Sequence, residues 1–184
     1  MKGGAMRRLI IVVVTALLLT TIAAGSVMAA SEKTVRTLGR GIIFKPNQLI
    51  AAVFRFTPER TTVDAGQRIR FADADQDNDE AHTVAIVDKA DLPTSFAEGD
   101  ACFAETAPCG QALAAHDPDG DQQPPFNLVV NKGKPGLDTA GDSLLFGGGL
   151  DNQSISAQVT AAPGTTLYYL CALHPLMQGR ITVR

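Results

Sequence analysis

Residues 171–184 read Cys-Ala-Leu-His-Pro-Leu-Met-Gln-Gly-Arg-Ile-Thr-Val-Arg, and three of their first seven side chains can bind a metal. These are the thiol of Cys171, the imidazole of His174 and the thioether of Met177, spaced Cys-x2-His-x2-Met. Soft ligands of this kind select copper over magnesium, calcium or manganese. Two imidazoles and one thiolate in a plane, with a weak axial thioether, form an electron-transfer copper site. The C-terminal stretch therefore offers all of these ligands except the second imidazole.

The missing imidazole must come from one of the other two histidines, His82 and His116. Alternate positions from His82 onward read His82, Val84 and Ile86, a period of two that describes one face of a strand. His82 begins this core-facing set, at the mouth of the strand, where a ligand can face a buried pocket. His116 lies in a polar, turn-rich segment, so we expect it at the surface. The predicted ligands of a single copper ion are therefore His82, Cys171, His174 and Met177.

Residues 168–183 resemble the copper-binding end of the cupredoxins, the type 1 blue copper proteins, and the Cys-x2-His-Pro-x-Met-x-Gly loop is most similar to that of amicyanin. Residues 62–71, followed by His-Thr-Val at 82–84, also resemble this family, in which a strand leads into the first histidine ligand. The resemblance covers residues 50–88 and 153–184. It implies a cupredoxin-like Greek-key β-sandwich that carries one electron through Cu(I)/Cu(II) cycling and breaks no substrate bond.

Short alternating runs bounded by Gly, Pro and Asp also favour an all-β sandwich. No long stretch has helical periodicity, and residues 35–44 fit no single element. Turns are expected at residues 64–66 and 162–164, where Asp-Ala-Gly and Ala-Pro-Gly stand. The expected strands lie at residues 49–56, 61–63, 67–72, 82–88, 153–159, 165–171 and 180–184.

Residues 88–152 are a long, loop-rich insertion between the first histidine ligand and the cysteine ligand. Only residues 126–130 and 143–146 resemble strands there, yet a structureless loop of this length is unusual in a compact domain. We therefore expect the insertion to have some order of its own. Cys102 and Cys109 lie inside it, and in an exported protein two such neighbours are expected to form a disulfide.

Residues 1–30 have the pattern of a cleaved secretory signal peptide, with a basic start, an apolar run and small residues near its end. The mature chain, residues 31–184, is then one domain with no membrane span, and we expect a periplasmic or extracellular monomer. Removal of three basic residues leaves 13 Lys+Arg against 19 Asp+Glu, a formal charge of −6. An acidic surface of this kind argues against nucleic acids and anionic membranes as partners.

The resemblance also implies how electrons reach the metal. In the family, the edge of the C-terminal histidine is the exposed route, so His174 would have this role, and its apolar neighbours Leu173, Pro175 and Leu176 would form the docking patch for a transient redox partner. Residues 73–80 form an acidic loop that departs from a calcium-loop template and is suited to steering a basic partner. Thr83 stands where many cupredoxins have asparagine, and its hydroxyl is expected to donate a bond that pins the ligand loop.

Three other classes of function compete with an electron carrier: a copper carrier, a copper enzyme and a metal-free binding module. A copper carrier or storage protein without a redox partner would use the same ligands. A multicopper oxidase needs His-x-His pairs, which this chain lacks, and a copper nitrite reductase needs further histidines when only His116 is spare. A sandwich that has lost its metal and serves as a binding module would not need the complete ligand set.

Overall fold

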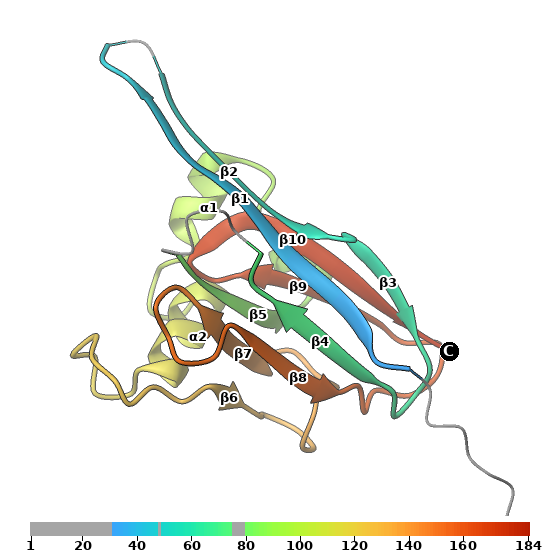
Figure 1. Ribbon diagram of the computed structural model, residues 1–184. Helices are drawn as coiled ribbons and strands as arrows, with labels where there is room; N and C mark the ends of the chain where they lie inside the picture. The colour runs from blue at the N-terminus through green and yellow to red at the C-terminus, as the bar shows by residue number, and fades with distance from the viewer. Residues whose placement is uncertain (1–30, 48, 75–79) are drawn as a thin grey trace, which may run out of the picture.

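The computed structural model describes residues 31–47, 49–74 and 80–184. The predicted signal peptide at residues 1–30 lies outside the described residues, and so does most of the predicted acidic loop, residues 75–79. The described chain folds into two β-sheets, with two short α-helices beside the second one (Figure 1). The expected β-sandwich is therefore confirmed.

The first sheet has the strand order β2-β1-β4-β8. β1 pairs antiparallel with β2 and parallel with β4. The segment at residues 35–44, which the sequence left unassigned, is therefore part of a strand. β4 pairs antiparallel with β8, which joins the chain before the insertion to the chain after it. The strands are β1 (Lys33–Lys45), β2 (Leu49–Thr57), β4 (Arg68–Ala72) and β8 (Ser154–Gln158).

The second sheet has the order β3-β10-β9-β5-β7-β6. β10 pairs antiparallel with β9 and parallel with β3, so the C-terminal stretch lies inside the sheet. β5 lies between β9 and β7 and pairs antiparallel with both. The strands are β3 (Arg60–Val63), β5 (Ala81–Val87), β6 (Val129–Val130), β7 (Ser143–Gly147), β9 (Thr166–Cys171) and β10 (His174–Val183).

The core between the two sheets is built around Tyr169, which is completely buried. The rings of Phe56 and Phe71, both in the first sheet, meet the Tyr169 ring edge-on, with centroids 4.9 Å and 5.6 Å away. Edge-to-face pairs of this kind stabilise beyond the area they bury. We call this set of buried residues, which also includes Val84, Ile86, Leu167, Cys171 and Met177, the inner cluster.

The insertion contains two α-helices, so the expectation that it has some order of its own is confirmed, although the sequence did not identify these helices. α1 (Phe96–Ala101) and α2 (Pro108–His116) span six and nine residues, too short to show the helical period clearly in the sequence. Their starts follow helix rules: Ser95 Oγ accepts a bond from the Glu98 N–H at 3.2 Å, and Pro108 opens α2. Cys102 and Cys109 form the predicted disulfide.

The insertion covers the face of β5 and β9 that points away from the first sheet. Leu170 and Ala172 are completely buried there against the disulfide, together with Ala85 and Val87. We call these six buried residues, Ala85, Val87, Cys102, Cys109, Leu170 and Ala172, the outer cluster. Because both faces of β5 are covered, six consecutive residues of this strand are buried, and its sequence does not alternate as a one-sided strand would.

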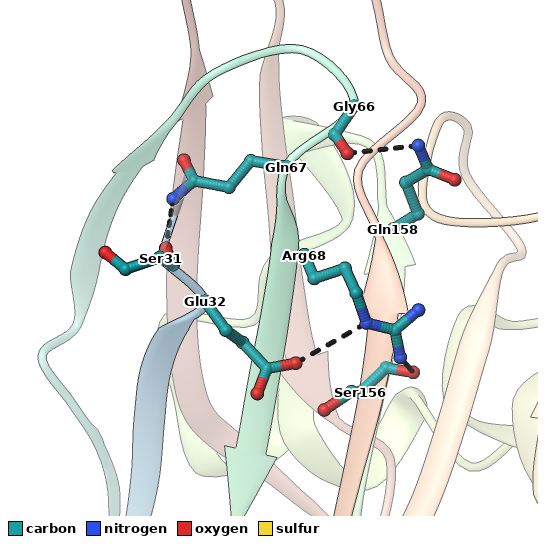
Figure 2. Close-up of polar contacts among 7 residues, drawn as sticks. All are labelled: Ser31, Glu32, Gly66, Gln67, Arg68, Ser156 and Gln158. Carbon is teal, nitrogen blue, oxygen red and sulfur yellow. Dashed lines mark hydrogen bonds and ion pairs between the residues drawn. The ribbon is translucent and has the colours of Figure 1, made fainter. Parts of the chain in front are cut away.

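Polar contacts fix the start of β1 at the end of the sandwich where the C-terminus lies (Figure 2). Gln67 Nε2 donates to the Ser31 carbonyl at 2.5 Å, and Gln158 Nε2 donates to the Gly66 carbonyl at 3.0 Å. Arg68 donates to the Ser156 carbonyl at 3.1 Å and lies 3.6 Å from the Glu32 carboxylate. In the part of the chain that the structure describes, no helix has the length and hydropathy needed to cross a membrane.

Candidate metal centre

Three of the predicted ligands meet at the opposite end of the sandwich. His82 is the second residue of β5, Cys171 the last of β9 and His174 the first of β10. Their ligand atoms all lie within 4.8 Å of one another. Cys171 Sγ is 3.9 Å from His82 Nδ1 and 3.5 Å from His174 Nδ1. His82 and Cys171 are completely buried, whereas the side chain of His174 remains 20% exposed.

Met177 lies on the same hairpin and is 2% exposed, within the inner cluster that also contains Cys171. The pairing of β9 with β10 is irregular here: His174 pairs with Cys171, but Gln178 pairs with Leu170. The extra residues between these pairs form the predicted ligand loop, although His174 and Met177 belong to β10 and not to a separate loop. Met177 and His174 line one shallow hollow with Phe54.

Thr83 ties the two ligand-bearing segments together. The backbone N–H of Ala172 donates to Thr83 Oγ1 at 2.6 Å, and the backbone N–H of Thr83 donates to Cys171 Sγ at 3.3 Å. The tie was expected, but in this contact the Thr83 hydroxyl accepts a hydrogen bond and does not donate one. A donor aimed at the sulfur and a fixed loop are the kind of outer contacts that orient and tune a metal ligand.

The two histidines favour the thiolate form of Cys171. Burial by itself raises the pKa of this thiol, but hydrogen bonds and charge from His174 and His82 outweigh burial and lower the pKa from 9.0 to about 6. The thiolate is the form that binds metals. The site therefore offers a deprotonated sulfur and two imidazoles at neutral pH, which is a donor set suited to copper.

Phe54 covers the centre from the opposite sheet, and the sequence did not identify it. Its ring stacks on the His174 ring with centroids 4.1 Å apart and an interplanar angle of 28°, and its centroid is 6.1 Å from that of His82. The only signal was its place in a predicted strand two residues before Phe56. The alternation of the strand predicts that both rings lie on one face, but it does not predict that this face reaches the metal ligands.

The predicted docking patch divides into exposed and covered residues. Leu173 and Leu176 are 36% and 44% exposed, whereas Pro175 is buried. Gly99 of α1 faces this segment so closely that an added Cβ would lie 3.9 Å from both Pro175 and Leu176. Two residues of the insertion extend the apolar surface, and the sequence had given no reason to place them here. They are Phe96, 82% exposed, and Phe103, 45% exposed, which line the same hollow as His174.

His116 is not a surface residue as predicted, because it ends α2 and packs against β7 with 2% exposure. Its Nε2 lies 2.8 Å from Ser143 Oγ, and its Nδ1 contacts the Asn127 carbonyl. Burial lowers the pKa of His116, with the Asn127 contact opposing this effect. The polar turn begins only after His116. The composition of the segment therefore led to the wrong prediction that this histidine lies at the surface. Its ring is not part of the group formed by His82, Cys171 and His174.

No protein-family model matches the sequence, and no curated protein sequence matches it. Solved structures of blue copper proteins do match in shape. Auracyanin A, a "blue" copper protein from Chloroflexus aurantiacus, is 18% identical with a TM-score of 0.41, over 84% of this chain and all of that chain. A plastocyanin from Dryopteris crassirhizoma is 18% identical with a TM-score of 0.39, over 82% of this chain and 99% of that chain.

Amicyanin from Paracoccus versutus is 13% identical with a TM-score of 0.37, over 84% of this chain and 83% of that chain. Likenesses at these identities and TM-scores say nothing about activity. The cupredoxin-like fold is visible in the chain itself, because a two-sheet sandwich places a histidine from β5 beside the cysteine and histidine of the C-terminal hairpin.

Proposed function

We propose that this chain binds one copper ion through His82, Cys171, His174 and Met177 and acts as a one-electron carrier. The observation that carries the proposal is the meeting of three ligand atoms, one sulfur and two imidazole nitrogens, within 4.8 Å at a largely buried position. When bound to such a set, copper supplies one-electron chemistry between Cu(I) and Cu(II) with little change of geometry.

The protein's own contribution is a rigid and dry frame. His82 and Cys171 are held by paired strands, and the Thr83–Ala172 bond at 2.6 Å joins their segments. Phe54 covers the histidines on one side. A frame that keeps its ligands in place and excludes water lowers the rearrangement that an electron transfer would otherwise require.

His174 is the route by which an electron would enter and leave. It is the only one of the three grouped ligands with an exposed edge, and apolar side chains from two parts of the chain surround it. We propose that Leu173, Leu176, Phe96 and Phe103 form a docking patch for a transient redox partner, with the largely covered Pro175 supporting it from below. Glu80 lies 3.8 Å from His174, and Asp100 lines the hollow, so we expect a basic rim on the partner.

Export and cleavage of residues 1–30 complete the proposal. A protein that works outside the cytoplasm would keep the Cys102–Cys109 disulfide oxidised, in agreement with its presence in the fold. The single remaining free cysteine of the described chain is Cys171, and metal binding gives it a role.

The deciding measurement is a visible and EPR spectrum of residues 31–184 titrated with Cu(II), for the wild type and the Cys171→Ser variant. We expect an intense thiolate-to-copper band that saturates at one equivalent in the wild type and is absent in the variant. A matched control is His116→Gln, which changes the histidine outside the group and should retain the band when the variant is folded by circular dichroism. A pale, tetragonal Cu(II) signal in the wild type would reject the electron-carrier proposal.

A copper carrier or storage protein remains the competing function. The rate at which copper is released to a chelator distinguishes such a protein from an electron carrier. The carrier would lose its copper quickly to a chelator, whereas the electron-transfer protein should hold it and exchange electrons quickly between its oxidised and reduced forms. Since two of the grouped ligands are completely buried, we expect slow release.

A further inference from the structure

The strand register leaves part of the ligand hairpin outside the hydrogen-bonded ladder. β10 pairs with β9 at His174 and again from Gln178, and its pairing with β3 begins only at Arg180. In the part of the chain that the structure describes, no strand pairs with residues 175–177. This segment follows one proposed ligand, His174, and ends in another, Met177. Because the ladder does not fix it, other contacts must hold these two ligands in place.

Gln178 supplies two of these contacts. Its backbone lies where the register with Leu170 resumes, so β9 sets its position. Its Nε2 donates to the Pro175 carbonyl at 3.0 Å and to the Pro93 carbonyl at 2.7 Å. Since both partners only accept, both hydrogens of the amide group are used, and the orientation of the amide is determined by them. One side chain thus joins the ligand hairpin to the insertion.

The insertion end of this tie is itself firmly held. Thr94 donates from its backbone N–H and from its hydroxyl to Glu98 Oε2, at 2.6 Å and 2.7 Å. The Glu98 N–H donates to Ser95 Oγ at the start of α1. Leu92, on the other side of Pro93, packs against the outer cluster. The Pro93 carbonyl is therefore an anchor that α1 and the disulfide layer keep in position.

The same segment also contacts its neighbours through packing. A Cβ added at Gly99 of α1 would lie 3.9 Å from the side chains of Pro175 and Leu176, so the helix rests against the segment. From the first sheet, the Phe54 ring stacks on the His174 ring with centroids 4.1 Å apart. Apolar packing of this kind is not directional, whereas hydrogen bonds have a defined geometry. The two bonds of Gln178 therefore specify where the segment lies.

We propose that Gln178 is a positioning residue for the metal centre, and that the insertion acts through it to hold His174 and Met177 in place around Cys171. The inference rests on the proposed copper site. Without the tie, the hairpin segment would move relative to β5 and β9, whose paired strands hold the other ligands. The insertion would thereby contribute to the site without supplying a ligand.

The test replaces Gln178 with methionine, which has a similar length but cannot donate a hydrogen bond. The matched control is Gln158→Met. It removes a bond of 3.0 Å from the same kind of amide group to the Gly66 carbonyl, at the far end of the sandwich (Figure 2). Both variants are made in residues 31–184, and their folding is checked by circular dichroism.

The first readout needs no metal. In metal-free Gln178→Met, the nuclear Overhauser contact between the rings of Phe54 and His174 should weaken. Exchange of the α1 amides should accelerate about tenfold, the effect expected when one or two hydrogen bonds are lost. Gln158→Met should change neither quantity.

The second readout adds copper. In copper-loaded Gln178→Met, the thiolate-to-copper band and the Cu(II) EPR spectrum should shift, and release of copper to a chelator should become about tenfold faster. Gln158→Met should behave as the wild type does. A residue that contributed only to stability would lower the urea midpoint and leave both spectra unchanged.

Wild-type copper spectra in folded Gln178→Met would overturn the proposal, and so would a Phe54–His174 contact and α1 exchange equal to those of the wild type. If the wild type itself forms no thiolate-to-copper band, the proposed copper site fails. The metal-free readout then still decides whether Gln178 holds His174 in place.

Discussion

The two faces of the central strand pair β5–β9 differ in what they bury and in what they do. The inner face carries large side chains such as Tyr169 and ends in His82 and Cys171, so the ligands belong to the same layer as the sandwich core. The outer face carries smaller side chains such as Ala85 and Leu170, and the disulfide packs against it. The inner face builds the metal centre, and the outer face supports it from behind.

This difference explains why two adjacent residues, Tyr169 and Leu170, stabilise different parts of the structure. The first connects the two sheets through aromatic contacts at 4.9 Å and 5.6 Å. Leu170 packs the second sheet against the insertion, a layer that a two-sheet sandwich lacks. The predictions below test whether these faces are as separate in stability and chemistry as they are in structure.

The largest effect is expected from Tyr169→Ala on the inner face. The change removes a completely buried ring that contacts Phe56 and Phe71, so the free energy of unfolding should fall by about 3–5 kcal/mol. Urea denaturation measures this. Tyr169→Phe is the control: the Tyr169 hydroxyl is buried without a hydrogen-bond partner among the described residues, so its loss should be neutral or stabilising. A cost above 1 kcal/mol for Tyr169→Phe would contradict this reading.

On the outer face, the double change Cys102→Ser and Cys109→Ser should cost about 2.5 kcal/mol in the chain-entropy model for so short a loop. Because the loop lies in the insertion, amide exchange should accelerate mainly in α1 and α2, and much less in β3 and β4. The thiolate-to-copper band of the proposed site should keep its position. Uniform acceleration throughout the chain would show that the two faces do not open separately.

Thr83→Val acts where the two ligand segments join. It leaves the buried N–H of Ala172 without its acceptor at 2.6 Å, so unfolding should become about 1–3 kcal/mol easier. Thr83→Ser keeps the oxygen and should restore most of the loss. A matching loss in Thr83→Ser, which retains the hydroxyl, would show that the hydrogen bond to Ala172 does not account for the effect.

At neutral pH, the smallest effect comes from the titration of Cys171 in the metal-free protein. The folded-state pKa of Cys171, about 6, lies below its ordinary value of 9.0, so folding favours the thiolate. This contribution to stability is fully present above pH 9.0, shrinks as the pH falls toward 6 and is lost below that. The free energy of unfolding is measured in urea at each pH for the wild type and for Cys171→Ser, and the difference between the two isolates the contribution of the thiolate. The ultraviolet absorption of the thiolate should titrate near pH 6 in the folded wild type, and a midpoint near 9 would contradict the histidine contacts.

Prediction from sequence was most successful where local pattern and burial agree. Strands at residues 49–56, 67–72 and 165–171 appear within one or two residues of β2, β4 and β9, because alternation follows directly from one buried face. It failed in the insertion, where α1 and α2 are too short to show a helical period, and at His116, which ends a helix before the polar turn begins.

The sequence by itself determined the donor set, because the identities of Cys171, His174 and Met177 and their spacing are written in the chain. It also determined that His82 starts a core-facing run. Only the tertiary structure decided that Phe54 stacks on His174, that Thr83 accepts from Ala172, and that the insertion forms an outer layer. The reason is physical: periodicity records the surroundings of each residue within one element, whereas these contacts join residues that only sheet packing brings together.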